Sequence, residues 1–118
     1  MIKIGILGSS GRVGSLLIDD LKNDTEAKVS CVHVFDKIEK VLPPDTVVTN
    51  DINVLFEQSD VIIDFSSPVA TEELLTAVVE GGKRKPLVIA TTGLSKHQQN
   101  LLLEASKLVP ILYATNMS

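Results

Sequence analysis

The stretch Ile4-Gly5-Ile6-Leu7-Gly8-Ser9-Ser10-Gly11-Arg12-Val13-Gly14 decides how this chain folds. An apolar run stops at a turn with glycines at positions 8, 11 and 14, and an amphipathic pattern begins directly after it. Glycine lets the backbone turn sharply and approach a ligand closely. The N–H groups and positive dipole end of a helix that starts there face an anion. The stretch therefore predicts a strand, a phosphate-binding turn and a helix.

The segments around this turn supply the context that the motif needs, because closely spaced glycines also occur in ordinary turns. Met1 to Leu7 has the pattern of a buried strand. Ser10 stands where the common fingerprint has its middle glycine, so the turn reads G-x-x-G-x-x-G. The residues that fall on one face of the following helix are Val13, Leu16, Leu17 and Leu21.

A second strand is predicted from Val29 to Phe35, with Val29, Cys31 and Phe35 on one side and Ser30 on the other. Asp36 ends it, about 20 positions after the glycine turn, as a dinucleotide-binding unit requires. A carboxylate there accepts hydrogen bonds from both hydroxyls of an adenosine ribose. The two strands, the helix and the acid predict a dinucleotide site rather than a chance turn.

Length and composition limit the class of protein. The 118 residues suffice for one domain but are few for a complete dehydrogenase, so we expect a further part to be missing. A net charge of −4 and 3% aromatic residues argue against a nucleic-acid partner, and Lys83-Arg84-Lys85 is interpreted as a solvated turn. The single cysteine, Cys31, reads as a small buried strand residue. We expect a cytoplasmic protein without a membrane span or a metal site.

Strand-like runs alternate mostly with helical patterns along the chain. They are Ile2 to Leu7, Val29 to Phe35, Val61 to Phe65, Leu87 to Ala90 and Ile111 to Ala114, with a candidate short strand at Val47-Val48. This alternation predicts a single α/β domain over residues 1–118. Its architecture is a Rossmann-type, doubly wound parallel sheet with helices on both faces.

Capping signals mark the helices. Ser67-Pro68 reads as N-cap and first helical residue, and that helix ends at Gly81-Gly82. Ser95 and Gln98 have the spacing of a capping box, and Asp51 is expected to cap a short helix. The residues expected to face inward are Leu74, Leu75, Val78 and Val79 on one helix and Leu101, Leu102, Ala105 and Leu108 on the other.

The residues directly after each strand, here termed strand exits, are considered together. Ligands of such sheets bind beyond the carboxyl ends of the strands, at the switch point in strand order. Any one exit residue is ordinarily a turn or a cap, but together they outline a nucleotide crevice. The exits are Gly8 to Arg12, Asp36-Lys37, Phe65-Ser66-Ser67, Thr91-Thr92-Gly93 and Thr115-Asn116.

Four motifs in order resemble the dihydrodipicolinate reductase family. Residues 8–14 resemble its G-x-x-G-R-M-G turn, and 61–68 its V-x-I-D-F-[ST]-x-P segment. Residues 88–93 resemble V-I-G-T-T-G, with Ala90 in place of the family's usual glycine, and 113–118 resemble A-x-N-[FM]-S. The family reduces 4-hydroxy-tetrahydrodipicolinate with NADH or NADPH on the bacterial route to diaminopimelate and lysine.

The resemblance implies a role for each matching residue. Asp36 would hold the adenosine ribose, and Lys37 stands where the family often has a basic residue near a 2′-phosphate, so NADH and NADPH both stay open. Thr91-Thr92-Gly93 would also border the substrate. The other implied cofactor contacts are Gly8, Ser9, Ser10, Gly11, Arg12 and Val13 at the pyrophosphate, Phe65 and Ser66 along the crevice, Ala90, Thr91 and Thr92 at the nicotinamide, and Ala114, Thr115, Asn116 and Met117 closing that side.

The resemblance also implies a missing second domain, whose histidine-rich H-H-x-x-K-x-D-x-P-S-G-T-A segment handles the substrate. His33 and His97 are interpreted as a core and a surface residue that do not replace it. We therefore expect this chain alone to bind a dinucleotide, to lack catalytic residues, and to bind the substrate only within the full-length enzyme. The full enzyme would be a homotetramer built largely through the second domain, and the isolated chain a monomer or weak dimer.

Two alternatives stay open at this point. The chain could be a free-standing nucleotide-binding or redox-sensing module, and a reading frame that continues past Ser118 into the histidine-rich segment would argue against that. An unrelated Rossmann reductase or epimerase is disfavoured, because Tyr113 is followed four positions later by Met117 rather than by lysine.

Overall fold

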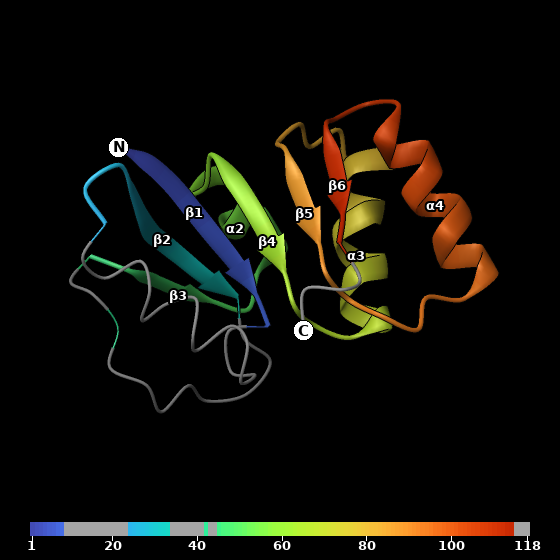
Figure 1. Cartoon of the computed structure of the whole chain (residues 1–118), viewed down its shortest axis with the longest axis horizontal. Coiled ribbons are helices and arrows are strands. Elements are labelled where there is room, and N and C mark those ends of the chain that lie inside the picture. Colours follow the sequence, from blue (N-terminus) through green and yellow to red (C-terminus); the bar gives the residue numbers. More distant parts are fainter. Residues whose placement is uncertain (9–23, 34–41, 43–44, 115–118) are drawn as a thin grey trace.

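The computed structural model describes residues 1–8, 24–33, 42 and 45–114. They form a parallel sheet in the order β3-β2-β1-β4-β5-β6 (Figure 1). The strands are β1 (Ile2–Leu7), β2 (Ala27–His33), β3 (Val47–Thr49), β4 (Val61–Asp64), β5 (Leu87–Ile89) and β6 (Ile111–Tyr113). The order reverses between β1 and β4, which is the switch point of a Rossmann sheet. The predicted α/β class and parallel sheet are confirmed.

Three described helices begin at the predicted caps: α2 (Ile52–Glu57), α3 (Pro68–Val79) and α4 (Lys96–Ser106). The Asp51 and Ser67 side chains accept hydrogen bonds from the amides of Asn53 and Ala70 at the starts of α2 and α3. At α4, Ser95 Oγ accepts from the Gln98 amide at 3.1 Å and Gln98 Oε1 accepts from the Ser95 amide at 2.8 Å. The expected capping box is therefore present.

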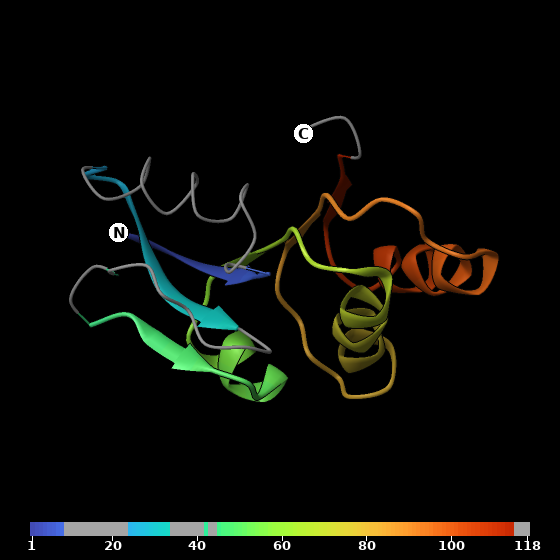
Figure 2. The same ribbon diagram turned by 90° about the horizontal axis from the view of Figure 1, so that it is seen from below.

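The sheet separates two apolar clusters. The described helices lie on one side of it (Figure 2), where they form the helix-side core, which includes Leu7, Cys31, Leu55, Phe56, Ile62, Leu74, Leu75, Val78, Ile89 and Ala105. The opposite face of the sheet carries a second cluster of Ile4, Ile6, Val29 and Val32. Helices are predicted on both faces of the sheet, and the described residues show them on one face. The helix predicted over Val13 to Leu21 lies outside the described residues.

A β-bulge in β2 overturns part of the predicted alternation. Ile4 pairs with Val29 but Gly5 pairs with Cys31, so Ser30 is an extra residue in the ladder. Val29 consequently lies in one apolar cluster and Cys31 in the other. The prediction that these two side chains share a face, with Ser30 opposite, is wrong. Ser30 is buried, and its Oγ donates to the carbonyl of Gln58, just after α2, at 2.6 Å.

The segments that follow α4 and α3 contain Leu108 and Arg84, whose surroundings depend on where each helix ends. Leu108 was expected to face inward, but it is 43% exposed because α4 ends at Ser106, and Val109 takes the buried position instead. The guanidinium of Arg84 donates to the carbonyls of Val78 at 2.7 Å and Lys83 at 2.9 Å. The basic trio lies between α3 and β5, as expected, but the turn itself is at residues 80 and 81 and the trio follows it as irregular chain, in which one cation satisfies a carbonyl of the last helical turn.

Candidate nucleotide-binding site

Backbone hydrogen bonds join the strand exits into one continuous edge. Each bond runs from the amide after one strand to a carbonyl at the end of its neighbour. These bonds are Gly8 to His33 at 3.3 Å, Phe65 to Leu7 at 2.9 Å, Ala90 to Asp64 at 2.9 Å and Ala114 to Ile89 at 2.8 Å. The exits of β1, β4, β5 and β6 therefore lie in sequence along the edge where a parallel sheet of this order binds its ligand.

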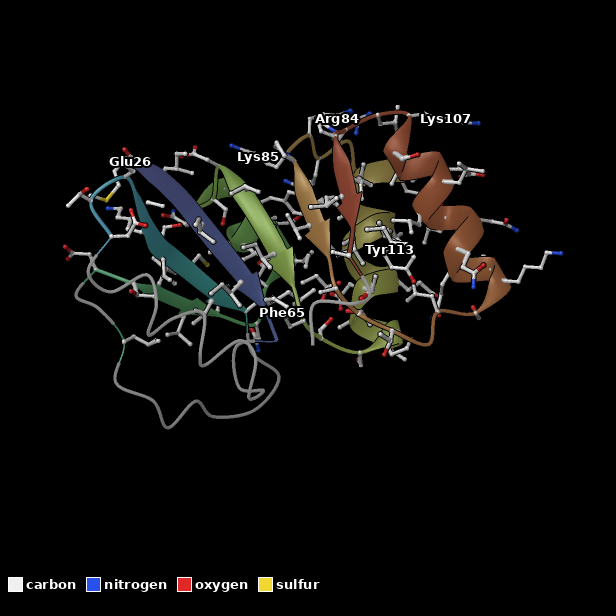
Figure 3. All side chains as sticks on the ribbon, viewed as in Figure 1. Glu26, Phe65, Arg84, Lys85, Lys107 and Tyr113 are labelled. Carbon is white, nitrogen blue, oxygen red and sulfur yellow. The ribbon has the colours of Figure 1, made fainter. Side chains whose placement is uncertain are left out.

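Gly8 brings the β1 and β4 exits into contact at the switch point. Its φ is +89°, a left-handed conformation that favours glycine. A Cβ atom on Gly8 would lie 2.8 Å from the carbonyl carbon and oxygen of Phe65 and 2.9 Å from Cα of Ser66. Figure 3 shows Phe65 at the ends of the strand arrows, with Arg84, Lys85 and Lys107 at the opposite edge of the molecule. The first glycine of the turn is thus required by both backbone conformation and space.

The buried carboxylate of Asp64, at the end of β4, collects hydrogen bonds from two strand exits and from α3. The amide of Ser66 donates to Oδ1 at 2.8 Å, and the Ser66 hydroxyl donates to the same oxygen. Thr91 Oγ1, from the β5 exit, also donates to Oδ1, at 3.1 Å. Thr71 Oγ1, in the first turn of α3, donates to Oδ2 at 2.5 Å.

These donors compensate a carboxylate that is fully shielded from solvent. Burial raises the pKa of Asp64 above its ordinary value, and the hydrogen bonds from Ser66, Thr71 and Thr91 lower it in part. Among the residues that the structure describes, the four donors are hydroxyl and amide groups and none is a cation, so this carboxylate acts as a structural acceptor. Its charge is held by oriented hydroxyl and amide groups.

The described members of the predicted site differ in what they offer a ligand. Phe65, Ser66, Ala90 and Ala114 are half-buried, and Thr92 is exposed. Thr91 is 3% exposed, and its hydroxyl is directed at Asp64. The described part of the edge therefore presents backbone, small side chains and the side chain of Phe65. The remaining predicted contacts lie outside the described residues: Ser9, Ser10, Gly11, Arg12, Val13, Asp36, Lys37, Thr115, Asn116 and Met117.

Sequence reasoning missed the role of Asp64, although it is part of the motif over residues 61–68. The usable signal was a carboxylate as the last residue of a buried strand, followed two positions later by a serine and matched by a threonine at the next exit. His33 is buried in β2 and His97 is exposed in the first turn of α4, as their interpretation anticipated. Within the described ranges, no three His, Cys, Asp or Glu side chains are grouped to hold a metal ion, and no helix is long and apolar enough to cross a membrane.

The family model and the similar sequences point to the same protein family. The model for the N-terminus of dihydrodipicolinate reductase matches residues 2–117. Over all 118 residues the chain is 76% identical to a 4-hydroxy-tetrahydrodipicolinate reductase of Aliarcobacter butzleri and 56% identical to one of Nitratiruptor sp.. The match covers 46% and 45% of those two proteins. The chain thus spans about half the length of the curated relatives it matches.

Solved structures show the same fold at low identity. A dipicolinate-bound dihydrodipicolinate reductase from Paenisporosarcina sp. aligns with a TM-score of 0.72 and 19% identity, over 94% of this chain and 46% of that one. A pyrroline carboxylate reductase from Plasmodium falciparum with NADP bound aligns with a TM-score of 0.61 and 19% identity, over 92% of this chain and 38% of that one. These likenesses support the Rossmann-type architecture.

Proposed function

The chain belongs to the dihydrodipicolinate reductase family, and we propose that it is the nicotinamide-dinucleotide-binding half of a 4-hydroxy-tetrahydrodipicolinate reductase. One observation carries the binding proposal: the positive-φ Gly8 touches the β4 exit at the switch point of a parallel sheet. Dinucleotides bind at this place in sheets of this order. The relatives favour this function over a free-standing module, because each carries the matching region within a longer reductase.

We assign the cofactor contacts as the motifs imply. The turn over residues 8–13 holds the pyrophosphate, and Asp36 holds the adenosine ribose. The β4 and β5 exits line the crevice with Phe65, Ser66, Ala90, Thr91 and Thr92, and residues 114–117 close the nicotinamide side. The absence of a Cβ at Gly8 and the small side chains along the edge fit the close approach of such a ligand.

The chemistry divides between the cofactor and the protein. NADH or NADPH, when bound, supplies the hydride that reduces the substrate. This chain binds and orients that cofactor, and the proton donor for the substrate comes from the other half of the full-length enzyme. We propose that the full-length enzyme is a homotetramer and that this chain alone is a monomer or a weak dimer. Both cofactors are proposed as ligands, because Asp36 suits a free ribose and Lys37 tolerates a 2′-phosphate.

Calorimetric titration of the chain with NADH and with NADPH tests the proposal. We expect binding of at least one cofactor. The Asp36→Ala variant is expected to weaken NADH binding by about 1 to 3 kcal/mol through the loss of a charged hydrogen-bond partner. Glu104→Ala is the control with the same charge change, because Glu104 is exposed on α4 near its C-terminal end. Binding of neither cofactor would refute the function, and equal affinities of Asp36→Ala and wild type would remove Asp36 from the site.

A further inference from the structure

We infer that Asp64 is a positioning residue that fixes the β4 and β5 exits relative to each other at the dinucleotide site. The inference rests on the proposed function. Asp64 holds the β5 exit through two separate contacts. Its main-chain carbonyl accepts from the amide of Ala90 at 2.9 Å, and its carboxylate accepts from the hydroxyl of Thr91 at 3.1 Å.

The same carboxylate also determines the conformation of the β4 exit. Both the amide and the hydroxyl of Ser66 donate to Asp64 Oδ1, which closes a local turn directly after the strand. The other oxygen, Oδ2, is held by Thr71 of α3. One buried side chain therefore connects a strand exit, the neighbouring strand exit and the helix that follows, so that a shift of any one of them breaks a hydrogen bond to a buried carboxylate.

This arrangement has a chemical consequence for the ligand. A hydroxyl has one proton. The Thr91 hydroxyl donates to Asp64, and the Ser66 hydroxyl has its shortest contact with Asp64 and a longer one, 3.4 Å, with the carbonyl of Ser67. The Ser66 hydroxyl, which is half-buried, is left with lone pairs that can only accept. It consequently suits ligand donors such as ribose hydroxyls or a carboxamide N–H, and it does not suit phosphate oxygens. Asp64 thus sets the polarity of this part of the edge as well as its shape.

Substitutions at Thr91 separate positioning from packing. Thr91→Val keeps the volume and removes the hydrogen bond to Asp64, whereas Thr91→Ser keeps the hydroxyl and removes a methyl group. Ser30→Ala is the control for the loss of a buried hydroxyl elsewhere, since Ser30 bonds to Gln58 at 2.6 Å and belongs to none of the strand exits. For each variant, urea unfolding gives stability and titration with NADH and NADPH gives affinity.

We expect Thr91→Val to raise the dissociation constant by about threefold to tenfold, the effect of one hydrogen bond. Thr91→Ser is expected to bind within about twofold of wild type. Ser30→Ala is expected to lose stability while keeping its affinity. Asp64→Asn is a second test of positioning, because the asparagine amide oxygen can still accept from Ser66 and Thr91. This variant is expected to bind the cofactor with a dissociation constant within about threefold of the wild-type value.

Each contrary result has a distinct meaning. Unchanged affinity in a destabilised Thr91→Val would overturn the inference and leave Asp64 with a structural role alone. Equal weakening by valine and serine would assign the effect to packing and overturn it as well. A folded Asp64→Asn that no longer binds would show that the negative charge itself acts on the ligand, contrary to positioning through hydrogen bonds. If wild type binds neither cofactor, the proposed function fails, and the inference that rests on it falls too.

Discussion

At Gly8, both the backbone conformation and the packing against the β4 exit require a residue without a side chain. Its φ of +89° disfavours any side chain, and a Cβ would also collide with the backbone of Phe65 and Ser66. Gly82 has a similar φ of +73° but has nothing within 4 Å of its Cβ position. We expect Gly82→Ala to lose about 1 kcal/mol of unfolding free energy from backbone strain, and Gly8→Ala to lose more.

Urea unfolding of the two alanine variants measures this difference, and titration with NADH measures its effect on binding. Gly8→Ala is expected to bind more weakly than Gly82→Ala, because the collision displaces the β4 exit. Equal losses of stability at both positions would show that the contact between Gly8 and Phe65 does not constrain the turn.

Cys31 provides a pH-dependent test at a single residue. Its thiol is fully buried in the helix-side core, and burial raises the pKa of Cys31 from 9.0 to about 11. Between these values the folded state keeps a proton that the unfolded state loses, so stability falls as pH rises. The free energy of unfolding of the wild type is expected to fall by about 2 kcal/mol between pH 9 and pH 11 relative to that of Cys31→Ala, which lacks this titration. Parallel pH profiles of the two proteins would contradict the burial of the thiol.

At the scale of elements, β1 packs directly against the turn between α2 and β4. A Cβ on Gly5 would lie 2.0 Å from Ser59 Oγ and 2.9 Å from Leu55 Cδ1. Gly5→Ala is therefore expected to cost about 1 to 3 kcal/mol through overpacking. Ser59 Oγ is buried and has no hydrogen-bond partner among the described residues, so its removal breaks no such bond there.

The double variant tests whether this contact is the cause. Ser59→Gly removes both serine atoms nearest the new methyl group, so Gly5→Ala with Ser59→Gly is expected to be more stable than the sum of the single effects predicts. Thermal and urea unfolding of the four proteins complete the cycle. Strict additivity would place the cost of Gly5→Ala elsewhere.

Local signals in the sequence explain which elements could be predicted. The caps at Asp51, Ser67 and Ser95 each act on amides within three positions, so a short stretch of sequence contains the whole interaction. The bulge at Ser30 depends on a partner 28 positions away, the carbonyl of Gln58, which no local pattern indicates. Leu108 fits the helical period, but its exposure depends on where α4 ends.

The same distinction applies to the candidate site. Gly8 and the strand exits could be predicted because parallel strands bring their carboxyl ends to one edge. The cluster around Asp64 could not, because its donors Ser66, Thr71 and Thr91 lie 2, 7 and 27 positions away and meet only in the folded chain. Topology thus predicts the edge at which we propose that a ligand binds, while the side-chain contacts around Asp64 come from packing.

At the scale of the whole molecule, we propose that this chain binds the cofactor and that the other half of the enzyme supplies the proton donor. This chain alone is therefore expected to bind the cofactor without turnover. General acid catalysis typically contributes about 10² to 10⁴-fold, and we assign the acid to the half of the reductase that this chain does not cover. These 118 residues, supplied with NADPH and freshly generated 4-hydroxy-tetrahydrodipicolinate, are expected to oxidise no cofactor above the protein-free rate. A polypeptide extended through the histidine-rich segment and the C-terminal part is expected to be active. Substrate-dependent oxidation by the 118 residues alone would contradict the proposal.

The position of β6 at the end of the sheet influences how the chain behaves when it is concentrated. β6 pairs with β5 on one side, and Leu112 and Tyr113 are 61% and 42% exposed. A sheet edge with uncovered apolar side chains is a template for adding strands from another molecule. Sedimentation velocity is expected to show reversible self-association that grows with concentration, and Leu112→Lys should suppress it by placing a charge on that edge. Colloidal stability, and not only catalysis, would then depend on what covers this strand.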